Sequence, residues 1–288
     1  MKIELHCHTR MSDGSLHFTE LLELAVQEQI GHLAVTNHDT TQGLAEMDEM
    51  CRERGIEFIP GIEISGYDTQ RQRRIHILGY FIEEDHEAIN ALCSPLLLRR
   101  HEGCCLATKR LIEAGYNIRW EDVLSYAEGG TGVYKQHIHI MHALIDQGYT
   151  DRIYGDLYKK LFSRGQRGER PGIAYIPTEY VDAKDAVRTI ILAGGVPVLA
   201  HPGQYQSFEA VDELVEVGLQ GIEVLHPLQR EEDELRAREL ALKYNLIMTG
   251  GSDFHGFYGE SPITLGSKSP DAAVVGALKE RKQLLLWG

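Results

Sequence analysis

The sequence predicts an α/β fold in which strands alternate with helices to form a parallel sheet, closed or nearly closed into a (β/α) barrel with an inserted helical cap. The 288 residues fit one barrel of roughly 250 residues with an insertion. Strand and helix patterns alternate at both ends of the chain, and only helical patterns occupy its middle. We expect residues 1–84 and 175–288 to form the barrel and residues 85–174 to form the cap.

The first part of the chain alternates short apolar runs with amphipathic segments. Leu21, Leu22 and Ala25 recur at helical spacing in one of these segments, which is typical of a helix with one buried face. A second helical segment ends at Gly55, a residue that readily closes a helix C-terminus. In order, we expect strands over residues 2–5, 32–36, 56–62 and 75–81, with helices over 18–30 and 41–54.

The middle of the chain breaks this alternation and the last part resumes it. Glycine-rich turns such as Gly129-Gly130 separate the helical segments of the middle, which are predicted over 92–114, 120–127, 137–147 and 153–162. The last part has predicted strands over 196–200, 221–225 and 246–249 and helices over 183–193, 208–217, 231–244 and 271–280. An insertion between two barrel strands would lie over one barrel face as a lid.

Composition and charge exclude several classes of protein. Apolar residues make up 43% of the chain and charged residues 25%, which is ordinary for a folded globular protein. The formal net charge of −14 disfavours a broad surface for duplex nucleic acid. No apolar run is long enough to span a membrane, and the five cysteines are scattered without a Cys-x-x-Cys pair. We expect a cytoplasmic protein that binds neither duplex DNA nor a membrane.

Histidines and carboxylates recur at one kind of position, just past the C-terminal end of a predicted strand. In a (β/α) barrel these ends face one another around the mouth, so residues far apart in the sequence converge there. In His6-Cys7-His8, strand geometry points both imidazoles to the same side. Asp13, in the loop after the first strand, and His76, in the fourth strand, can join them. The candidate site therefore comprises His6, His8, Asp13, His38, Glu63, His76, His201, Asp253 and His255.

Six imidazoles and three carboxylates in one barrel mouth predict a metal centre. Bringing carboxylates together is unfavourable without compensating positive charge, and divalent cations accept mixed nitrogen and oxygen ligands. This number of ligands exceeds what one ion takes from a protein, so two or three divalent ions fit better. Paired ions suit hydrolysis at phosphorus, because they generate hydroxide and stabilise both the attacking and the leaving oxygen.

A set of motifs in register makes the chain resemble the PHP (polymerase and histidinol phosphatase) family. They are His6-Cys7-His8-Thr9 with Ser12-Asp13-Gly14, Thr36-Asn37-His38-Asp39, Pro60-Gly61-Ile62-Glu63, His76-Ile77-Leu78-Gly79-Tyr80, Ala200-His201-Pro202-Gly203 and Gly251-Ser252-Asp253-Phe254-His255. The resemblance implies a distorted seven-stranded, TIM-like (β/α) barrel. It also implies two or three ions of manganese, zinc or iron. One ion would be held by His6, His8, Glu63 and Asp253, and a second by Glu63, His76 and His201. A third ion, where present, would be held by Asp13, His38 and His255.

Within that family, the Ser12-Asp13-Gly14 form and the length of the cap resemble the small stand-alone phosphoesterases. The resemblance implies hydrolysis of a phosphomonoester of a nucleotide, either a nucleoside 3′,5′-bisphosphate or a 5′-mononucleotide, by metal-activated hydroxide, with Glu63 shared by two ions. Two alternatives are a 5′-to-3′ exoribonuclease acting on the 5′ end of short RNA and a histidinol-phosphate phosphatase. A catalytically inert metal-binding module is a further hypothesis, which the intact motifs disfavour.

One stretch of the cap departs from the family pattern. Relatives tend to carry an Arg-Pro-His motif that contacts the substrate phosphate, and this chain has Lys135-Gln136-His137 at the matching place. A lysine supplies positive charge but lacks the bidentate fork of arginine. We still predict that Lys135 and His137 contact the substrate and take part in catalysis.

Two other features have a functional and a structural interpretation. His226 follows the strand over 221–225 and is a candidate for substrate contact, and Glu223 is a weaker candidate of the same kind. The basic run of Arg71, Arg73 and Arg74 is interpreted as a solvated hairpin loop, because charge runs are usually solvated.

Overall fold

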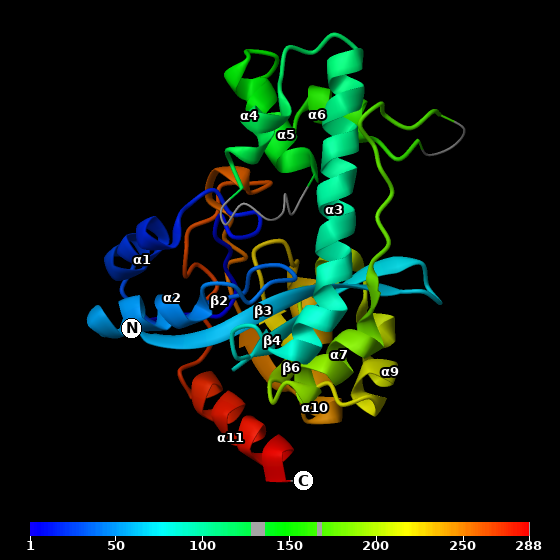
Figure 1. The fold of residues 1–288 in the computed structure, drawn as a ribbon. Coiled ribbons are helices and arrows are strands. Elements are labelled where there is room, and N and C mark those ends of the chain that lie inside the picture. The colour runs from blue at the N-terminus through cyan, green and yellow to red at the C-terminus, as the bar shows by residue number, and fades with distance from the viewer. Residues whose placement is uncertain (128–135, 166–168, 288) are drawn as a thin grey trace.

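The computed structural model of the chain describes residues 1–127, 136–165 and 169–287. Its centre is a mixed eight-stranded sheet in the order β1-β2-β3-β4-β6-β7-β8, with the short β5 paired to β3 (Figure 1). Helices follow most of the strands, so the predicted α/β class is confirmed. The strands are β1 (Lys2–Glu4), β2 (Ile30–Val35), β3 (Glu57–Asp68), β4 (Arg73–Tyr80), β5 (Val181–Asp182), β6 (Val196–Leu199), β7 (Gly221–Leu225) and β8 (Ile247–Gly250).

The direction of β4 corrects the expectation of a parallel sheet. The strands β1 to β3 run parallel, and so do β6 to β8, but β4 is antiparallel to both of its neighbours. The reason is the short connection over residues 69–72, since a parallel crossover needs a dozen residues or more. Because β4 is reversed, its first residues lie at the edge of the sheet where the parallel strands end.

The sheet is curved, but its pairing does not close into a complete ladder, and β1 and β8 are its ends among the described residues. A single bridge between Cys7 and Phe254 joins the segments that follow these two strands. Beside it, the buried carboxylate of Glu4 accepts hydrogen bonds from the backbone N–H groups of His6 and Ser252, at 3.0 and 2.9 Å. The predicted closure is interrupted here because a side chain, and not a neighbouring strand, pairs these backbone donors.

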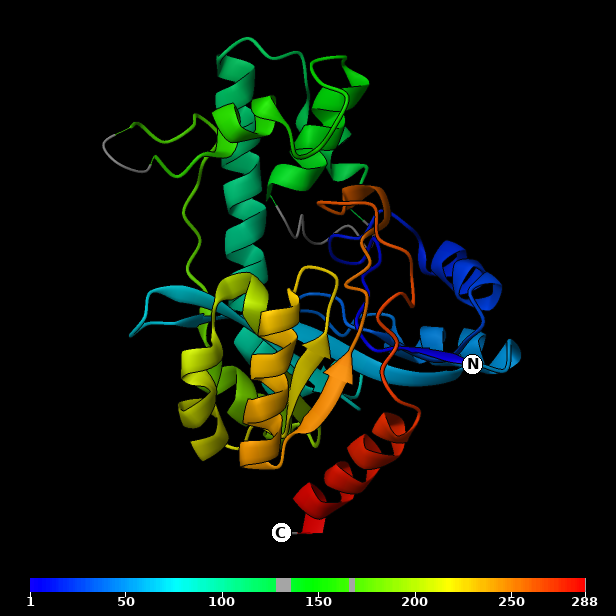
Figure 2. The ribbon, with the colours of Figure 1, turned by 180° about the vertical axis from the view of Figure 1, so that it is seen from behind.

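Apolar side chains from both ends of the sheet share one cluster with the C-terminal helix. Ile3 of β1, Leu78 of β4 and Ile247 of β8 pack there with Leu278. Figure 2 shows this helix below the strands, at the end away from their arrowheads. The helices around the sheet are α1 (Phe18–Gln27), α2 (Leu44–Glu53), α7 (Ala183–Leu192), α9 (Val211–Glu216), α10 (Glu231–Tyr244) and α11 (Ala273–Trp287).

A helical cap stands over the sheet (Figures 1 and 2). The long helix α3 runs from the sheet into the cap, where its second half packs with α5 and its neighbours. Its first half contributes Ile89 and Cys93 to the core of the sheet, and its second half contributes Cys104 and Leu111 to a separate core. The cap helices are α3 (Glu87–Glu113), α4 (Trp120–Leu124), α5 (Gln136–Asp146) and α6 (Asp156–Phe162).

Three short helical turns complete the fold. They are α8 (Pro202–Tyr205), η2 (Phe208–Ala210) and η3 (Gly256–Tyr258). Turns of three or four residues are too short to leave a periodic pattern in the sequence, so α8 and η3 were not among the predicted elements.

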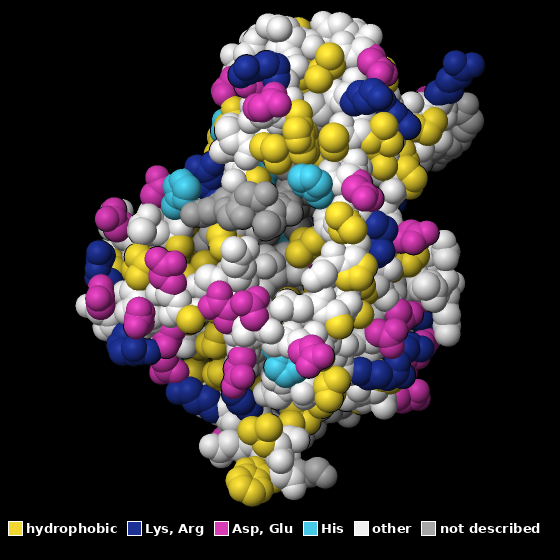
Figure 3. Space-filling view, viewed as in Figure 1, with side chains coloured by type: hydrophobic (Ala, Val, Ile, Leu, Met, Phe, Trp, Pro, Cys, Tyr) yellow, Lys and Arg dark blue, Asp and Glu magenta, His cyan; other side chains and the backbone are white. Residues whose placement is uncertain are grey.

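The face of the molecule in Figure 3 carries Lys, Arg, Asp and Glu side chains interspersed with one another. The negative net charge is therefore not gathered into one acidic patch on this face. In the part of the chain that the structure describes, no helix has both the length and the apolar composition needed to cross a bilayer.

Candidate metal centre

The nine candidate ligands converge at one edge of the sheet, beneath the cap. Eight of them are buried, and the side chain of Asp253 is 14% exposed. They come from segments that are distant in sequence. They lie together because the ends of the parallel strands and the start of the reversed β4 meet at this edge. We call this set the ligand cluster: His6, His8, Asp13, His38, Glu63, His76, His201, Asp253 and His255.

The carboxylate of Glu63 is the centre of the ligand cluster, and five imidazoles contact it. Its Oε1 atom lies 2.7 Å from Nδ1 of His76 and 2.9 Å from Nε2 of His201. Its Oε2 atom lies 3.2, 3.3 and 3.2 Å from the Nε2 atoms of His6, His8 and His38. Imidazole nitrogens therefore surround both oxygens of this carboxylate.

The other two carboxylates complete the ligand cluster. Oδ1 of Asp253 lies 3.1 Å from Nε2 of His8 and 3.3 Å from Nε2 of His6. Oδ2 of Asp13 lies 3.1 Å from Nε2 of His255, and its Oδ1 lies 3.5 Å from Nδ1 of His8. The imidazole of His8 therefore lies among three carboxylates, with its Nε2 toward Glu63 and Asp253 and its Nδ1 toward Asp13.

Three groups of side chains in the ligand cluster each bring their ligand atoms within 4.8 Å of one another. Each group combines imidazole nitrogens with carboxylate oxygens, the donor set that zinc and other first-row divalent ions accept. One group is the first of the three sets that the family resemblance implies. The groups are His6, His8, Glu63 and Asp253; His8, Asp13, His38 and His255; and His38, Glu63 and His76.

The electrostatics of the ligand cluster favour positive charge between the side chains. Burial opposes protonation of His8, but hydrogen bonds to Asp253 and Glu63 outweigh burial and raise its pKa to about 9. Burial acts to raise the pKa of Glu63, but the surrounding imidazoles hold it well below its ordinary value. Nε2 of His6 and Nδ1 of His201 are buried without a hydrogen-bond partner in the described structure. Divalent cations supply positive charge and bind such nitrogens, so the residues present fit a metal centre.

A buried carboxylate behind the ligand cluster orients two of its members. Oε1 of Glu223 in β7 lies 3.0 Å from Nδ1 of His6, and its Oε2 accepts the backbone N–H of His201 at 2.8 Å. With Nδ1 of His6 donating to this carboxylate, its Nε2 is left for the ligand cluster. Glu223, a weak sequence candidate for substrate contact, is thus a supporting residue behind the candidate ligands.

Two candidate ligands have a backbone conformation that is uncommon for a residue with a side chain. The φ angle is 25° at His201 and 50° at Asp253. Such conformations cost about 1–3 kcal/mol each and persist where the surrounding structure enforces them. Both residues lie two or three positions past the end of a strand, where the turn of the chain directs their side chains into the ligand cluster.

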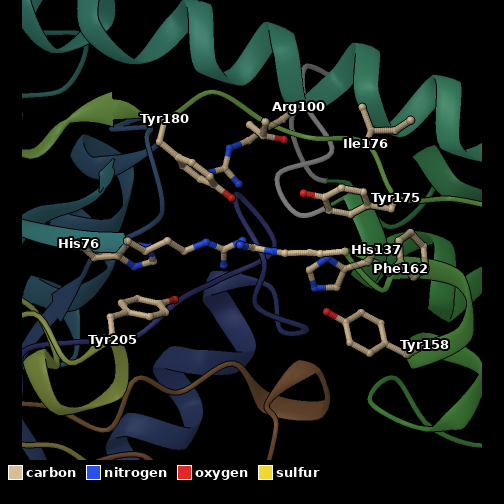
Figure 4. A pocket seen from close by; sticks show the side chains of 12 residues that line it. His76, Arg100, His137, Tyr158, Phe162, Tyr175, Ile176, Tyr180 and Tyr205 are labelled. Atoms are coloured by element: carbon tan, nitrogen blue, oxygen red, sulfur yellow. The ribbon is translucent and has the colours of Figure 1, made fainter. Parts of the chain in front are cut away.

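A cavity of about 230 Å³ opens beside the ligand cluster, and His76 belongs to both. Figure 4 shows His76 and Tyr205 on one side of it and His137, Tyr158 and Phe162 from the cap on the other. The rings of His76 and Tyr205 meet with their centroids 4.9 Å apart. A molecule bound in this cavity would therefore contact the sheet, the ligand cluster and the cap together.

The charge of the cavity is positive. Arg74 of β4, Arg100 of α3 and Arg164 line it, and among the described residues no carboxylate does. Anionic compounds are drawn into clefts of this kind, and the guanidinium group matches phosphate oxygens with two parallel hydrogen bonds.

The predicted substrate contacts lie in different places. His137 lines the cavity, and its ring centroid lies 5.0 Å from that of Tyr158. Lys135 lies outside the described residues. His226 is fully buried, with its Nε2 3.3 Å from Oδ2 of Asp253, so in this structure it contacts the ligand cluster and does not line the cavity.

The interpretation of Arg74 as part of a solvated loop is wrong. Arg74 lies in β4, is half-buried and lines the cavity. Alternation along the strand carried the missed signal, because Arg74 precedes His76 by two residues and so faces the same side. Arg100 had no comparable signal, since it reaches the cavity from the middle of α3 through tertiary packing alone.

Comparisons with known proteins agree with this geometry. A model of the PHP domain matches residues 4–194. Phosphoribosyl 1,2-cyclic phosphate 1,2-diphosphodiesterase of Eggerthella lenta is 45% identical over 259 residues, which cover 90% of this chain and 96% of that protein. The 3′,5′-nucleoside bisphosphate phosphatase of Chromobacterium violaceum is 30% identical, over 88% of this chain and 87% of its own.

Two further similarities complete the comparison. The 5′-3′ exoribonuclease Rnm of Salmonella typhimurium is 32% identical, over 88% of this chain and 84% of its own. A crystal structure from Bifidobacterium adolescentis, of a protein assigned as a metal-dependent phosphoesterase, superposes with a TM-score of 0.86 at 28% identity. The superposition covers 96% of this chain and 95% of that one.

Proposed function

The chain belongs to the PHP domain family, and on that premise we propose that this phosphoester hydrolase acts on a small phosphorylated ribose compound, with phosphoribosyl 1,2-cyclic phosphate as the first candidate. One observation carries the proposal: the ligand cluster around Glu63 opens at His76 into a cavity lined by three arginines. A phosphate ester bound there would lie at the candidate metal ligands with its remaining charge among guanidinium groups.

We assign two or three divalent ions, manganese, zinc or iron, to the ligand cluster, with Glu63 shared between two of them. When bound, such ions activate water for attack at phosphorus and neutralise the charge of the phosphate. The chain's own residues hold this arrangement in place. Glu223 fixes the ring of His6, and the strained turn at His201 directs its imidazole to Oε1 of Glu63.

Residues of the cap act on the substrate from the opposite side. His137 lines the cavity across from His76, so it can donate a hydrogen bond to a phosphate oxygen or to the leaving oxygen. Lys135 remains a proposed contact on the basis of the motif that it shares with His137. His226 acts in this proposal through Asp253, whose Oδ2 atom it contacts.

The choice of phosphoribosyl 1,2-cyclic phosphate rests on similarity along nearly the whole chain. The Eggerthella lenta relative that is named for this substrate shares 45% identity over 90% of this chain. Its substrate carries a phosphate besides the cyclic phosphate, which suits a cavity with an excess of positive charge.

A nucleoside 3′,5′-bisphosphate, which the family resemblance made the first expectation, is the second candidate here. Next to His137, the rings of Tyr158 and Phe162 stack with centroids 5.6 Å apart and line the cavity. Aromatic faces of this kind can hold a nucleobase. The relative from Chromobacterium violaceum is named for such a substrate.

The test is hydrolysis of a panel of substrates by the manganese-loaded chain, with the products separated by chromatography. The expected products are inorganic phosphate from a monoester, the ring-opened monoester and then inorganic phosphate from the cyclic ester, and nucleoside 5′-monophosphates from RNA. The panel contains phosphoribosyl 1,2-cyclic phosphate, adenosine 3′,5′-bisphosphate, AMP, histidinol phosphate and a 5′-phosphorylated RNA oligonucleotide. We expect the highest kcat/KM with the first compound. The highest value with the RNA oligonucleotide, together with its stepwise shortening, would instead identify an exoribonuclease, and no hydrolysis of any ester would reject the proposal.

A further inference from the structure

We propose that Arg74 and Arg100 form a subsite for a second phosphate group of the substrate, one that is bound but not hydrolysed. This inference rests on the proposed function and narrows it to a class of substrate, namely ribose compounds that carry a phosphate in addition to the reacting one. Neither arginine belongs to the ligand cluster, and both line the cavity beside it.

The two guanidinium groups converge although they come from different parts of the fold. Cζ of Arg74, from β4, lies 5.2 Å from the ring centroid of Tyr180, and Cζ of Arg100, from α3, lies 5.5 Å from it. One aromatic ring therefore faces two cations. Figure 4 shows Arg100 and Tyr180 next to each other at one side of the cavity.

Among the residues that the structure describes, only one of these two positive charges has a carboxylate partner. A guanidinium nitrogen of Arg100 lies 3.2 Å from Oδ2 of Asp39, whose Oδ1 accepts the backbone N–H of Ser65 at 2.8 Å. No described carboxylate lies within 4.0 Å of the guanidinium of Arg74. Two converging cations with one counter-anion leave an excess positive charge, and an added anion would offset the repulsion between them.

The polar contacts of Arg74 are also incomplete. Its Nε is buried without a hydrogen-bond partner among the described residues, and the phenol oxygen of Tyr205 accepts a hydrogen bond from its side chain. A guanidinium group has five N–H donors in a planar fork, and phosphate oxygens accept two of them in parallel. A phosphate bound in the cavity would satisfy these donors.

The position of this subsite fits one substrate with two phosphates. Arg74 and His76 are two residues apart in β4, so their side chains face the same side of the strand with Cα atoms about 7 Å apart. His76 contacts Glu63 at 2.7 Å, at the centre of the ligand cluster. A ribose can bridge the gap between a phosphate ester at Glu63 and a phosphate at Arg74.

The kinetic test compares Arg74→Gln with Arg73→Gln. Arg73 is the neighbouring residue of β4 and faces the other side, where it contacts the backbone oxygen of Gln206 and the carboxylate of Glu209. For manganese-loaded Arg74→Gln we expect kcat/KM with phosphoribosyl 1,2-cyclic phosphate to fall by about 10- to 100-fold. With p-nitrophenyl phosphate, which has no second phosphate, we expect a change of less than about twofold. The Arg73→Gln control should resemble the wild type with both compounds.

A binding test examines the subsite without the reaction. Calorimetry measures the affinity of chelator-treated protein for ribose 5-phosphate, because no metal ion is then present to bind its single phosphate at the ligand cluster. We expect Arg74→Gln to bind at least about tenfold more weakly than the wild type and Arg73→Gln to bind equally. Equal binding by wild type and Arg74→Gln, or no binding by the wild type, would overturn the subsite.

These two tests separate the subsite from the proposed function. Absence of hydrolysis with every ester would reject the proposed function, while ribose 5-phosphate binding that depends on Arg74 would still support an anion subsite. Conversely, an active enzyme in which Arg74→Gln lowers kcat/KM equally for both substrates would reject the subsite alone, because the loss would not depend on the second phosphate.

Discussion

The Nδ1 atom of His6 lies 3.0 Å from the Oε1 atom of Glu223, deep in the sheet and away from the cavity. The other oxygen of the same carboxylate binds the backbone of His201. One residue of β7 therefore links the ends of β1 and β6, which carry two candidate ligands. The arrangement resembles the carboxylate that lies behind many metal-ligating histidines and fixes the tautomer and the orientation of the imidazole.

Replacing Glu223 by Gln should weaken metal retention. The amide keeps the size of the side chain but removes the negative charge that orients His6, and we expect the affinity for Mn²⁺ or Zn²⁺ to fall by about 10- to 100-fold. Metal content after dialysis against a graded chelator series measures this. Glu216→Gln, at an exposed position of α9, is the matched control. An unchanged metal content in Glu223→Gln would contradict the supporting role.

Replacing Glu63 by Ala should remove activity together with about one equivalent of bound metal, because both of its oxygens face imidazoles that we assign to two ions. Metal analysis and phosphate release on the same preparation test this, with circular dichroism to establish that the variant is folded. Treatment of the wild type with a chelator should likewise abolish phosphate release, and added manganese should restore it. Near-normal turnover by Glu63→Ala would sink the assignment of Glu63 as a shared ligand.

Replacing Gly251 by Ala should destabilise the protein. A Cβ atom at this position would lie 2.3 Å from Cβ of His6 and 2.6 Å from its backbone nitrogen, so the segments after β8 and β1 would have to move apart. We expect a loss of about 1–3 kcal/mol in the free energy of unfolding, measured by urea denaturation. Gly276→Ala in α11 is the control, since a Cβ there meets nothing within 4 Å and should stabilise the helix slightly. Equal stability of the two variants would disprove the close approach.

Acid should destabilise the cap through His139. Burial between Tyr126 and Tyr258 lowers the pKa of His139 to about 4, from about 6.5 in the unfolded chain. The unfolded state therefore takes up a proton first as the pH falls. The contribution of His139 to the free energy of unfolding is complete above about pH 6.5. It decreases by about 2 kcal/mol between pH 7 and pH 5. Urea denaturation of His139→Phe at both pH values should show a correspondingly smaller loss, and a loss equal to that of the wild type would refute the assignment.

The ligand cluster could be predicted because its signal is local. Strand ends that carry His6, His8 or Asp253 are visible as short apolar runs followed by polar residues, and a (β/α) arrangement places such ends together. The supporting carboxylates were harder to assign. Glu4 and Glu223 lie within strands, where a charged residue has no periodic signal of its function, and their partners come from other strands.

The cavity was less predictable than the ligand cluster because it depends on the direction of β4. A parallel β4 would have placed the end of the strand at the mouth, whereas the reversed strand places Arg74 and His76 there. The predicted strands over 56–62 and 75–81 left residues 63–74 between them, which is long enough for a parallel crossover. The four-residue connection before Arg73 was therefore not visible in the sequence pattern. The approach of Arg100 to Asp39 joins the middle of α3 to the end of β2, which no sequence pattern specifies.

Because α3 contributes side chains to two apolar cores, we expect the cap and the sheet to unfold together. Loss of the cap core would remove the packing around Leu111. Ile89, in the core of the sheet, belongs to the same continuous helix, so its packing would be weakened as well. Arg100 lies between these two halves, so the cavity that it lines keeps its shape only while both cores hold the helix. Heating should therefore abolish substrate affinity and melt the chain in one transition, without an intermediate in which a folded sheet has lost its cap.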